Sequence, residues 1–130
     1  MSTLLALALL LSAPQGTSGD SFASRVTQGK LVEAGNTGPA YQKQLWSRIT
    51  DSSAAALKAC IASNAPADKS PFTVVADVAP DGKPHRIDVQ PATPVANCFA
   101  TRLGKMTLPA PPTLPDRASY PIEIDVSIVP

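Results

Sequence analysis

The sequence predicts an α+β domain in which two helices cover one face of a three-stranded antiparallel sheet, in the order α-β-β-α-β. Two observations support this fold class. Apolar residues recur every three to four positions in residues 41–63 and 94–106, which is typical of a helix with one buried stripe. Apolar and polar residues alternate in residues 72–78, 85–90 and 120–128, as they do in strands that bury one face.

The first helix is expected over residues 41–63. Gly38-Pro39 precedes it and places a proline in the first turn, where its missing N–H is not needed. Trp46 falls on the apolar stripe, so we expect it in the core; the alternative is a ligand patch formed with Tyr41 and Phe72. The polar run 51–53 interrupts the stripe, and Asp51 offers an N-cap for a second short helix after a break.

Turn and cap signals define the remaining elements. Pro80-Asp81-Gly82-Lys83 predicts a tight turn, so the first two strands form an antiparallel hairpin. Thr93-Pro94 supplies an N-cap hydroxyl and then a proline at the first position of the second helix. The last strand is predicted to be the longest. Its apolar face carries Tyr120, Ile122, Ile124, Val126 and Ile128.

The other face of the sheet is predicted to be polar and exposed to solvent. It carries Thr73, Asp77, Arg86, Asp88, Glu123 and Asp125. Paired carboxylates can perform acid–base catalysis or hold Ca²⁺. The simpler interpretation is a solvated sheet face that Arg86 partly balances.

An export signal is expected at the start of the chain. The apolar run 3–13 has the length of a signal-peptide core and is too short to span a membrane. We therefore expect a signal peptide over residues 1–19, a flexible linker rich in Gly, Ser and Thr over residues 20–39, and one domain over residues 40–130. The mature form is expected to have no membrane span and to reside in the periplasm or outside the cell.

The two cysteines, Cys60 and Cys98, each lie in the apolar stripe of a predicted helix. In an oxidising compartment a disulfide is the default for such a pair. Helices on the same sheet face bring their cysteines within the Cα separation of about 4.4–6.8 Å that a disulfide needs. The sequence therefore predicts a Cys60–Cys98 bridge between the helices.

Composition excludes several functional classes. The net charge is +1, with 11 basic and 10 acidic residues, and aromatic residues make up 5% of the chain. Nucleic-acid-binding surfaces are normally basic and often use aromatic stacking, so a nucleic-acid partner is not expected. His85 is the single histidine, so neither a histidine metal site nor a Ser–His–Asp triad is expected. We expect no catalytic, metal-binding or cofactor-binding residues, and no enzyme.

A family resemblance emerges from the order of short segments across residues 45–130. These are Leu57-Lys58-Ala59-Cys60, the Asp81-Gly82 turn, Val95-Ala96-Asn97-Cys98-Phe99, Met106-Thr107-Leu108-Pro109-Ala110-Pro111 and Tyr120-Pro121-Ile122. Together they resemble the TonB/TolA C-terminal-domain superfamily, in its cysteine-bearing, exported branch. The resemblance implies a bacterial envelope domain that binds other proteins, often by pairing an exposed strand. The linker is too short to cross a periplasm as energy-transducing members do, and the Tyr-Pro motif that precedes their first helix is absent.

The last strand is the expected binding surface. If it lies at the sheet edge, its free backbone groups can accept a partner strand. We therefore expect residues 119–128 to bind another envelope protein or a second copy of the chain. The alternative is a small secreted enzyme or enzyme inhibitor that acts through the proline-rich loop 108–117. An inhibitor of this kind would need that loop to stand away from the sheet.

Overall fold

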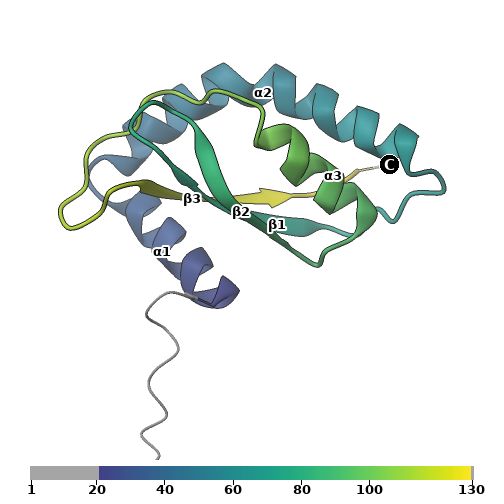
Figure 1. The fold of residues 1–130 in the computed structure, drawn as a ribbon, viewed down its shortest axis with the longest axis horizontal. Coiled ribbons are helices and arrows are strands. Elements are labelled where there is room, and N and C mark those ends of the chain that lie inside the picture. Colours follow the sequence, from purple (N-terminus) through teal and green to yellow (C-terminus); the bar gives the residue numbers. More distant parts are fainter. Residues whose placement is uncertain (1–20, 130) are drawn as a thin grey trace, which may run out of the picture.

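The computed structural model describes residues 21–129, so the expected signal peptide at residues 1–19 lies outside the described residues. It contains three helices and three strands: α1 (Phe22–Ala34), α2 (Gly38–Ser63), β1 (Phe72–Val78), β2 (Pro84–Gln90), α3 (Pro94–Leu103) and β3 (Tyr120–Val126). The strands form one antiparallel sheet in the order β2-β1-β3. The predicted α-β-β-α-β order is thus confirmed from α2 to β3 (Figure 1).

The sheet is covered on both faces. Helices α2 and α3 lie on the apolar face, while α1 lies on the opposite side of the sheet from α2 and contacts β3 and β1 (Figure 1). The prediction of a flexible linker over residues 20–39 is therefore wrong, because residues 22–34 form α1. The expectation of a fully solvated polar sheet face is wrong for the same reason.

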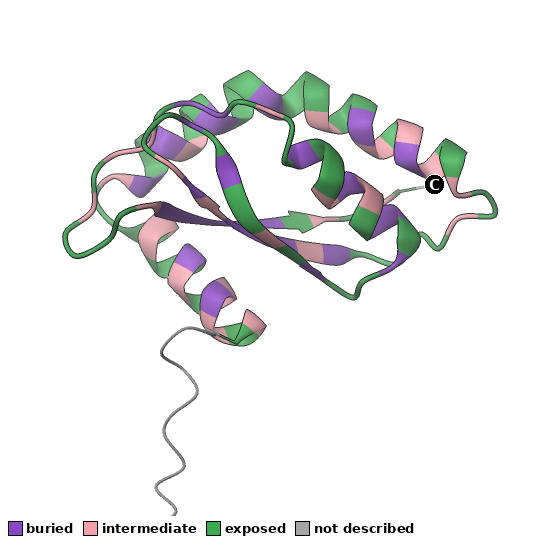
Figure 2. Cartoon of the chain, viewed as in Figure 1, coloured by how far each residue is buried: buried purple, intermediate pink, exposed green. Residues whose placement is uncertain are grey.

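Helix α1 is defined by its caps and by one glycine rather than by an apolar stripe. The Ser21 hydroxyl accepts a hydrogen bond from the Ser24 amide at 3.0 Å, which caps the helix start. Its buried positions are Arg25 and Gly29 (Figure 2). A Cβ added at Gly29 would lie 2.8 Å from the Cβ of Glu123. Only glycine therefore lets the α1 backbone approach β3 this closely.

Helix α2 is continuous, so the predicted interruption at residues 51–53 is wrong. Asp51 and Ser52 are exposed, so their polar side chains face solvent and do not interrupt the buried side of the helix. The Ser53 hydroxyl donates to the Ile49 carbonyl at 2.6 Å. This bond satisfies the hydroxyl within the helix, as serines inside helices commonly do.

The hairpin between β1 and β2 forms as predicted and contains a bulge. Gly82 adopts φ 89° in the turn, a conformation that favours glycine. Val75 pairs with Asp88 and Asp77 with His85, so two residues of β2 face one residue of β1 between these pairs. One of the two is Arg86, with φ 50°.

Strand β3 is shorter than predicted. All three strands have 7 residues, so β3 is not the longest, and Ile128 lies beyond its end. The first paired residue of β1 is Phe72, which faces Val126. Pro71 precedes Phe72 and has no N–H to donate, which limits further pairing at this end.

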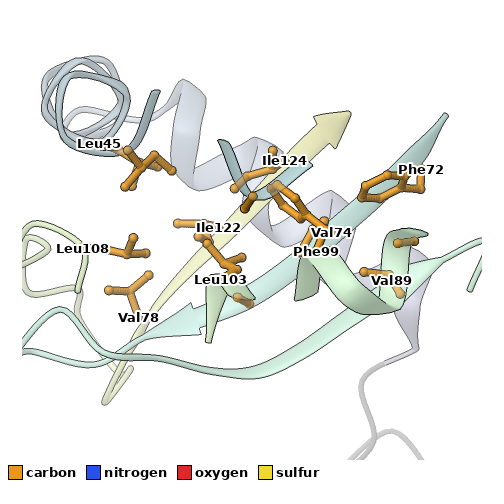
Figure 3. Packing of buried hydrophobic residues seen from close by; sticks show 14 of the residues in the cluster. Leu45, Phe72, Val74, Val78, Val89, Phe99, Leu103, Leu108, Ile122 and Ile124 are labelled. Atoms are coloured by element: carbon orange, nitrogen blue, oxygen red, sulfur yellow. The ribbon is translucent and has the colours of Figure 1, made fainter. Parts of the chain in front are cut away.

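The core fills the space between the sheet and the helices α2 and α3. Side chains from both helices and from all three strands point toward one another there (Figure 3). Two aromatic pairs lie in it: Tyr41 with Tyr120, with ring centroids 4.7 Å apart, and Phe72 with Phe99, at 5.7 Å.

The predicted disulfide is confirmed. Cys60 in α2 bonds to Cys98 in α3, with Cα atoms 5.7 Å apart and a sequence separation of 38. A cross-link over a loop of this length stabilises by about 4 kcal/mol in the chain-entropy model. That is a large part of the stability of a small domain, which is on the order of 5–15 kcal/mol.

Candidate functional site

Strand β3 is an edge strand. Its pairing with β1 runs from Phe72–Val126 to Val78–Tyr120, and no strand among residues 21–129 pairs with its other side. Edge strands present backbone N–H and C=O groups that another strand can bind. The structure thus places the predicted partner-binding strand at an edge of the sheet.

The predicted site side chains are mostly core residues. Tyr120, Ile122 and Ile124 are only 2%, 2% and 4% exposed. Val126 and Ile128 are half-buried. These exposed fractions count backbone and side chain together, so the buried residues 120–124 offer a partner neither. The accessible part of this edge begins at Asp125, which is exposed.

An apolar groove lies beside this edge, between α2 and the second half of β3. Its volume is about 220 Å³. Helix α2 contributes most of its lining, and α3 and β3 complete it. The lining residues are Trp46, Ile49, Thr50, Ser53, Ala54, Leu57, Phe99, Ile124, Asp125, Val126 and Ser127. A strand added to β3 would direct every second side chain toward this groove, because side chains alternate between the two faces of a sheet.

Trp46 corrects the expectation of a core residue. It lines the groove and is 39% exposed, and its indole N–H donates to the Gln42 carboxamide oxygen at 3.1 Å. Aromatic residues with one apolar side and one polar contact are typical of protein interfaces. Trp46, Ile49 and Leu57 belong to the predicted apolar stripe of α2, but the stripe alone does not separate core positions from groove positions.

On the opposite face, α1 brings a lysine over two of the predicted carboxylates. The Lys30 ammonium lies 3.4 Å from Glu123 and 3.5 Å from Asp125. Asp125 also accepts a hydrogen bond from the Thr73 hydroxyl at 2.8 Å. The Glu123 side chain is 3% exposed, and its Oε1 atom has no hydrogen-bond partner in the structure.

This environment shifts the pKa values of Glu123 and Asp125 in opposite directions. Burial raises the pKa of Glu123 to about 7, and neighbouring Asp125 contributes to the rise. Hydrogen bonds with Glu123 and Thr73 lower the pKa of Asp125. Glu123 therefore holds a proton up to near-neutral pH while Asp125 stays ionised.

The other two predicted carboxylates lie apart from this pair. Asp77 forms an ion pair with Arg86 at 3.0 Å and lies 3.9 Å from Arg25. Asp88 is exposed and accepts a hydrogen bond from the Val89 amide. The four predicted carboxylates therefore do not form one cluster. No group of metal-ligating side chains occurs in the part of the chain that the structure describes. The lone histidine, His85, is exposed.

The loop before β3 does not stand away from the domain at its start. Leu108 and Pro109 are buried, the Tyr41 hydroxyl donates to the Pro109 carbonyl at 2.9 Å, and the Leu108 amide donates to the Gly82 carbonyl at 2.9 Å. These bonds tie the loop to α2 and to the hairpin turn. An insertion loop for an enzyme would need this segment to be free.

Comparison with known proteins gave no match: no protein-family model, curated protein or solved structure is similar enough to this chain to place it. Between residues 21 and 129, none of the helices combines the length and apolar character needed to cross a membrane.

Proposed function

We propose that this chain is an exported protein-binding domain of the bacterial cell envelope that adds a strand of a partner protein to the exposed end of β3, from Asp125 onward. The observation that carries the proposal is the juxtaposition of an edge strand with an apolar groove that exposes Trp46. The resemblance to the TonB/TolA C-terminal-domain superfamily implies the same mode of binding. The Cys60–Cys98 disulfide is compatible with an oxidising compartment.

The two sides of β3 define what the partner strand would carry. Backbone hydrogen bonds to β3 give affinity, and alternate side chains give specificity. On the helix side, an apolar or aromatic side chain would fit between Trp46 and Leu57. On the α1 side, the partner would pass the Asp125 side chain, which is 61% exposed, and a lysine or arginine there is favourable.

Charge favours a different protein over a second copy. Antiparallel pairing of β3 with β3 of another copy would place the exposed, ionised Asp125 of both chains on one face of the joined sheet. Like charges that face each other across strands are destabilising. A partner strand with a basic residue avoids this repulsion.

The groove can be filled without touching the backbone of β3. Ala54 and Ala55 are neighbouring exposed residues of α2, but only Ala54 lines the groove. We expect Ala54→Trp to abolish partner capture from envelope extracts, because its indole would occupy the space for the partner's side chain. Ala55→Trp is the matched control and should capture as the parent chain does.

Two results would contradict the proposal. One is equal capture by the Ala54→Trp variant. The other is intact capture by an Asp125→Pro variant whose circular dichroism matches that of the parent, since proline cannot donate to an added strand.

A further inference from the structure

A second pocket, on the α1 face of the sheet, is rich in arginine. Its volume is about 180 Å³. Its polar lining comes from α1, β1, β2 and the segment just before β3: Arg25, Gln28, Asp77, Arg86, Arg117 and Ser119. It is separate from the groove on the opposite face, since the two share none of their lining residues.

The pocket carries more positive than negative charge. Asp77 is the one carboxylate in its lining, and it faces the guanidinium groups of Arg86 at 3.0 Å and Arg25 at 3.9 Å. The third arginine, Arg117, donates to the neutral Gln28 side chain at 3.2 Å. Three guanidinium groups against one carboxylate leave a net charge of +2 (3 − 1) around the cavity.

Arg25 is held in place by one side-chain hydrogen bond, which leaves most of its guanidinium N–H donors without a protein acceptor. Its side chain is 10% exposed, and its Nη2 donates to the Arg86 carbonyl at 2.6 Å. A guanidinium group has five N–H donors. The Arg25 side chain donates no other hydrogen bond to the described residues, and none of its nitrogens is a fully buried atom without a partner, so its remaining donors stay accessible from the pocket. An anion in the pocket would give these donors acceptors.

The β2 bulge directs a second arginine to the same place. Arg86 has φ 50°, which is uncommon for a residue other than glycine, and it is one of the two bulge residues. Bulges redirect side chains and often occur beside binding sites. Here the bulge accompanies the approach of Arg86 to Asp77.

We propose that this pocket binds the phosphate group of a small molecule. Arginine binds phosphate through paired hydrogen bonds in a fixed geometry, and three arginines from three segments converge here. A water molecule takes about 30 Å³ of liquid volume, so the cavity has room for a phosphate group and a short substituent. The bound group would join α1 to β2 and to the segment before β3.

The test is a calorimetric titration of the chain with inorganic phosphate and with glycerol 3-phosphate. The ionic strength is held constant with sodium chloride. We expect saturable binding, tighter for the ester. Arg117→Gln should weaken it about tenfold, the loss expected for one charge-assisted hydrogen bond. Arg102→Gln, an exposed substitution in α3 outside the pocket, should leave affinity unchanged.

Three results would overturn the proposal. One is an absence of binding beyond that of chloride. Another is equal affinity in the Arg117→Gln variant, with its fold verified by circular dichroism. The third is tighter binding of succinate than of either phosphate, which would assign the pocket to carboxylates. Binding of inorganic phosphate alone would support the phosphate class and exclude a substituent.

Discussion

Glu123 of β3 lies where α1 packs against the sheet. Gly29 of α1 lies against its Cβ, the Lys30 ammonium lies 3.4 Å from its carboxyl group, and Asp125 lies beside it on the same sheet face. Its burial could not be predicted from the sequence, because strand alternation alone places it on a solvated face. Only the docking of α1 covers it.

Glu123 should make stability depend on pH between about 4.5 and about 7. Burial raises its pKa to about 7 from an ordinary 4.5, so the folded chain binds this proton more tightly than the unfolded chain does. Its contribution to the free energy of unfolding is therefore complete below pH 4.5 and is lost as the pH rises through 7. Lys30 and Asp125 titrate outside this window, because the pKa of Lys30 is raised from 10.5 and that of Asp125 is lowered from 3.8.

The check is urea unfolding of the parent chain and of Glu123→Gln at several pH values from 4.5 to 7.5. Across this range the free energy of unfolding of the parent should fall by on the order of 2 kcal/mol relative to that of the variant, since each pKa unit corresponds to about 1.4 kcal/mol. Asp88→Asn, which changes an exposed carboxylate, is the control and should follow the parent. Identical pH profiles for the parent and Glu123→Gln would show that this carboxyl is not the source.

At the scale of elements, the sequence predicts what depends on local patterns and misses what depends on tertiary contact. The strands and α3 follow from alternation and from the Thr93-Pro94 start, where the Thr93 hydroxyl does cap the Ala96 amide. Helix α1 was missed because it docks through Gly29 and charged side chains, so it has no apolar periodicity. The groove was missed because it depends on how α2 lies beside β3.

The disulfide between α2 and α3 gives the element-scale prediction. The double variant Cys60→Ser/Cys98→Ser should unfold with a free energy about 4 kcal/mol below that of the oxidised parent, because the unfolded chain regains the freedom of a long loop. Denaturant titration with and without reductant measures this. Reductant should lower the stability of the parent toward that of the variant and leave the variant unchanged. Equal stability of the oxidised parent and the variant would contradict the prediction.

At the scale of the whole molecule, the sheet separates two candidate sites. The groove beside β3 uses α2 and α3, and the arginine pocket uses α1 and the polar sheet face. Helix α1 belongs to one site and not to the other. Removing it is therefore a way to test the two sites independently in one chain.

A chain that begins at residue 36 lacks α1 but keeps α2, α3 and the sheet. We expect it to fold, since the apolar core and the disulfide are retained. It should lose phosphate binding because Arg25 and Gln28 are gone, and it should lose the pH dependence between about 4.5 and about 7 because Glu123 is exposed and regains an ordinary pKa. Partner capture should persist, because no residue of α1 lines the groove.

Calorimetry, urea unfolding at several pH values and capture from envelope extracts test these outcomes on a chain that begins at residue 21 and on the truncated one. Loss of capture by a truncated chain with a native circular dichroism spectrum would show that the partner binds α1 instead of the edge of β3.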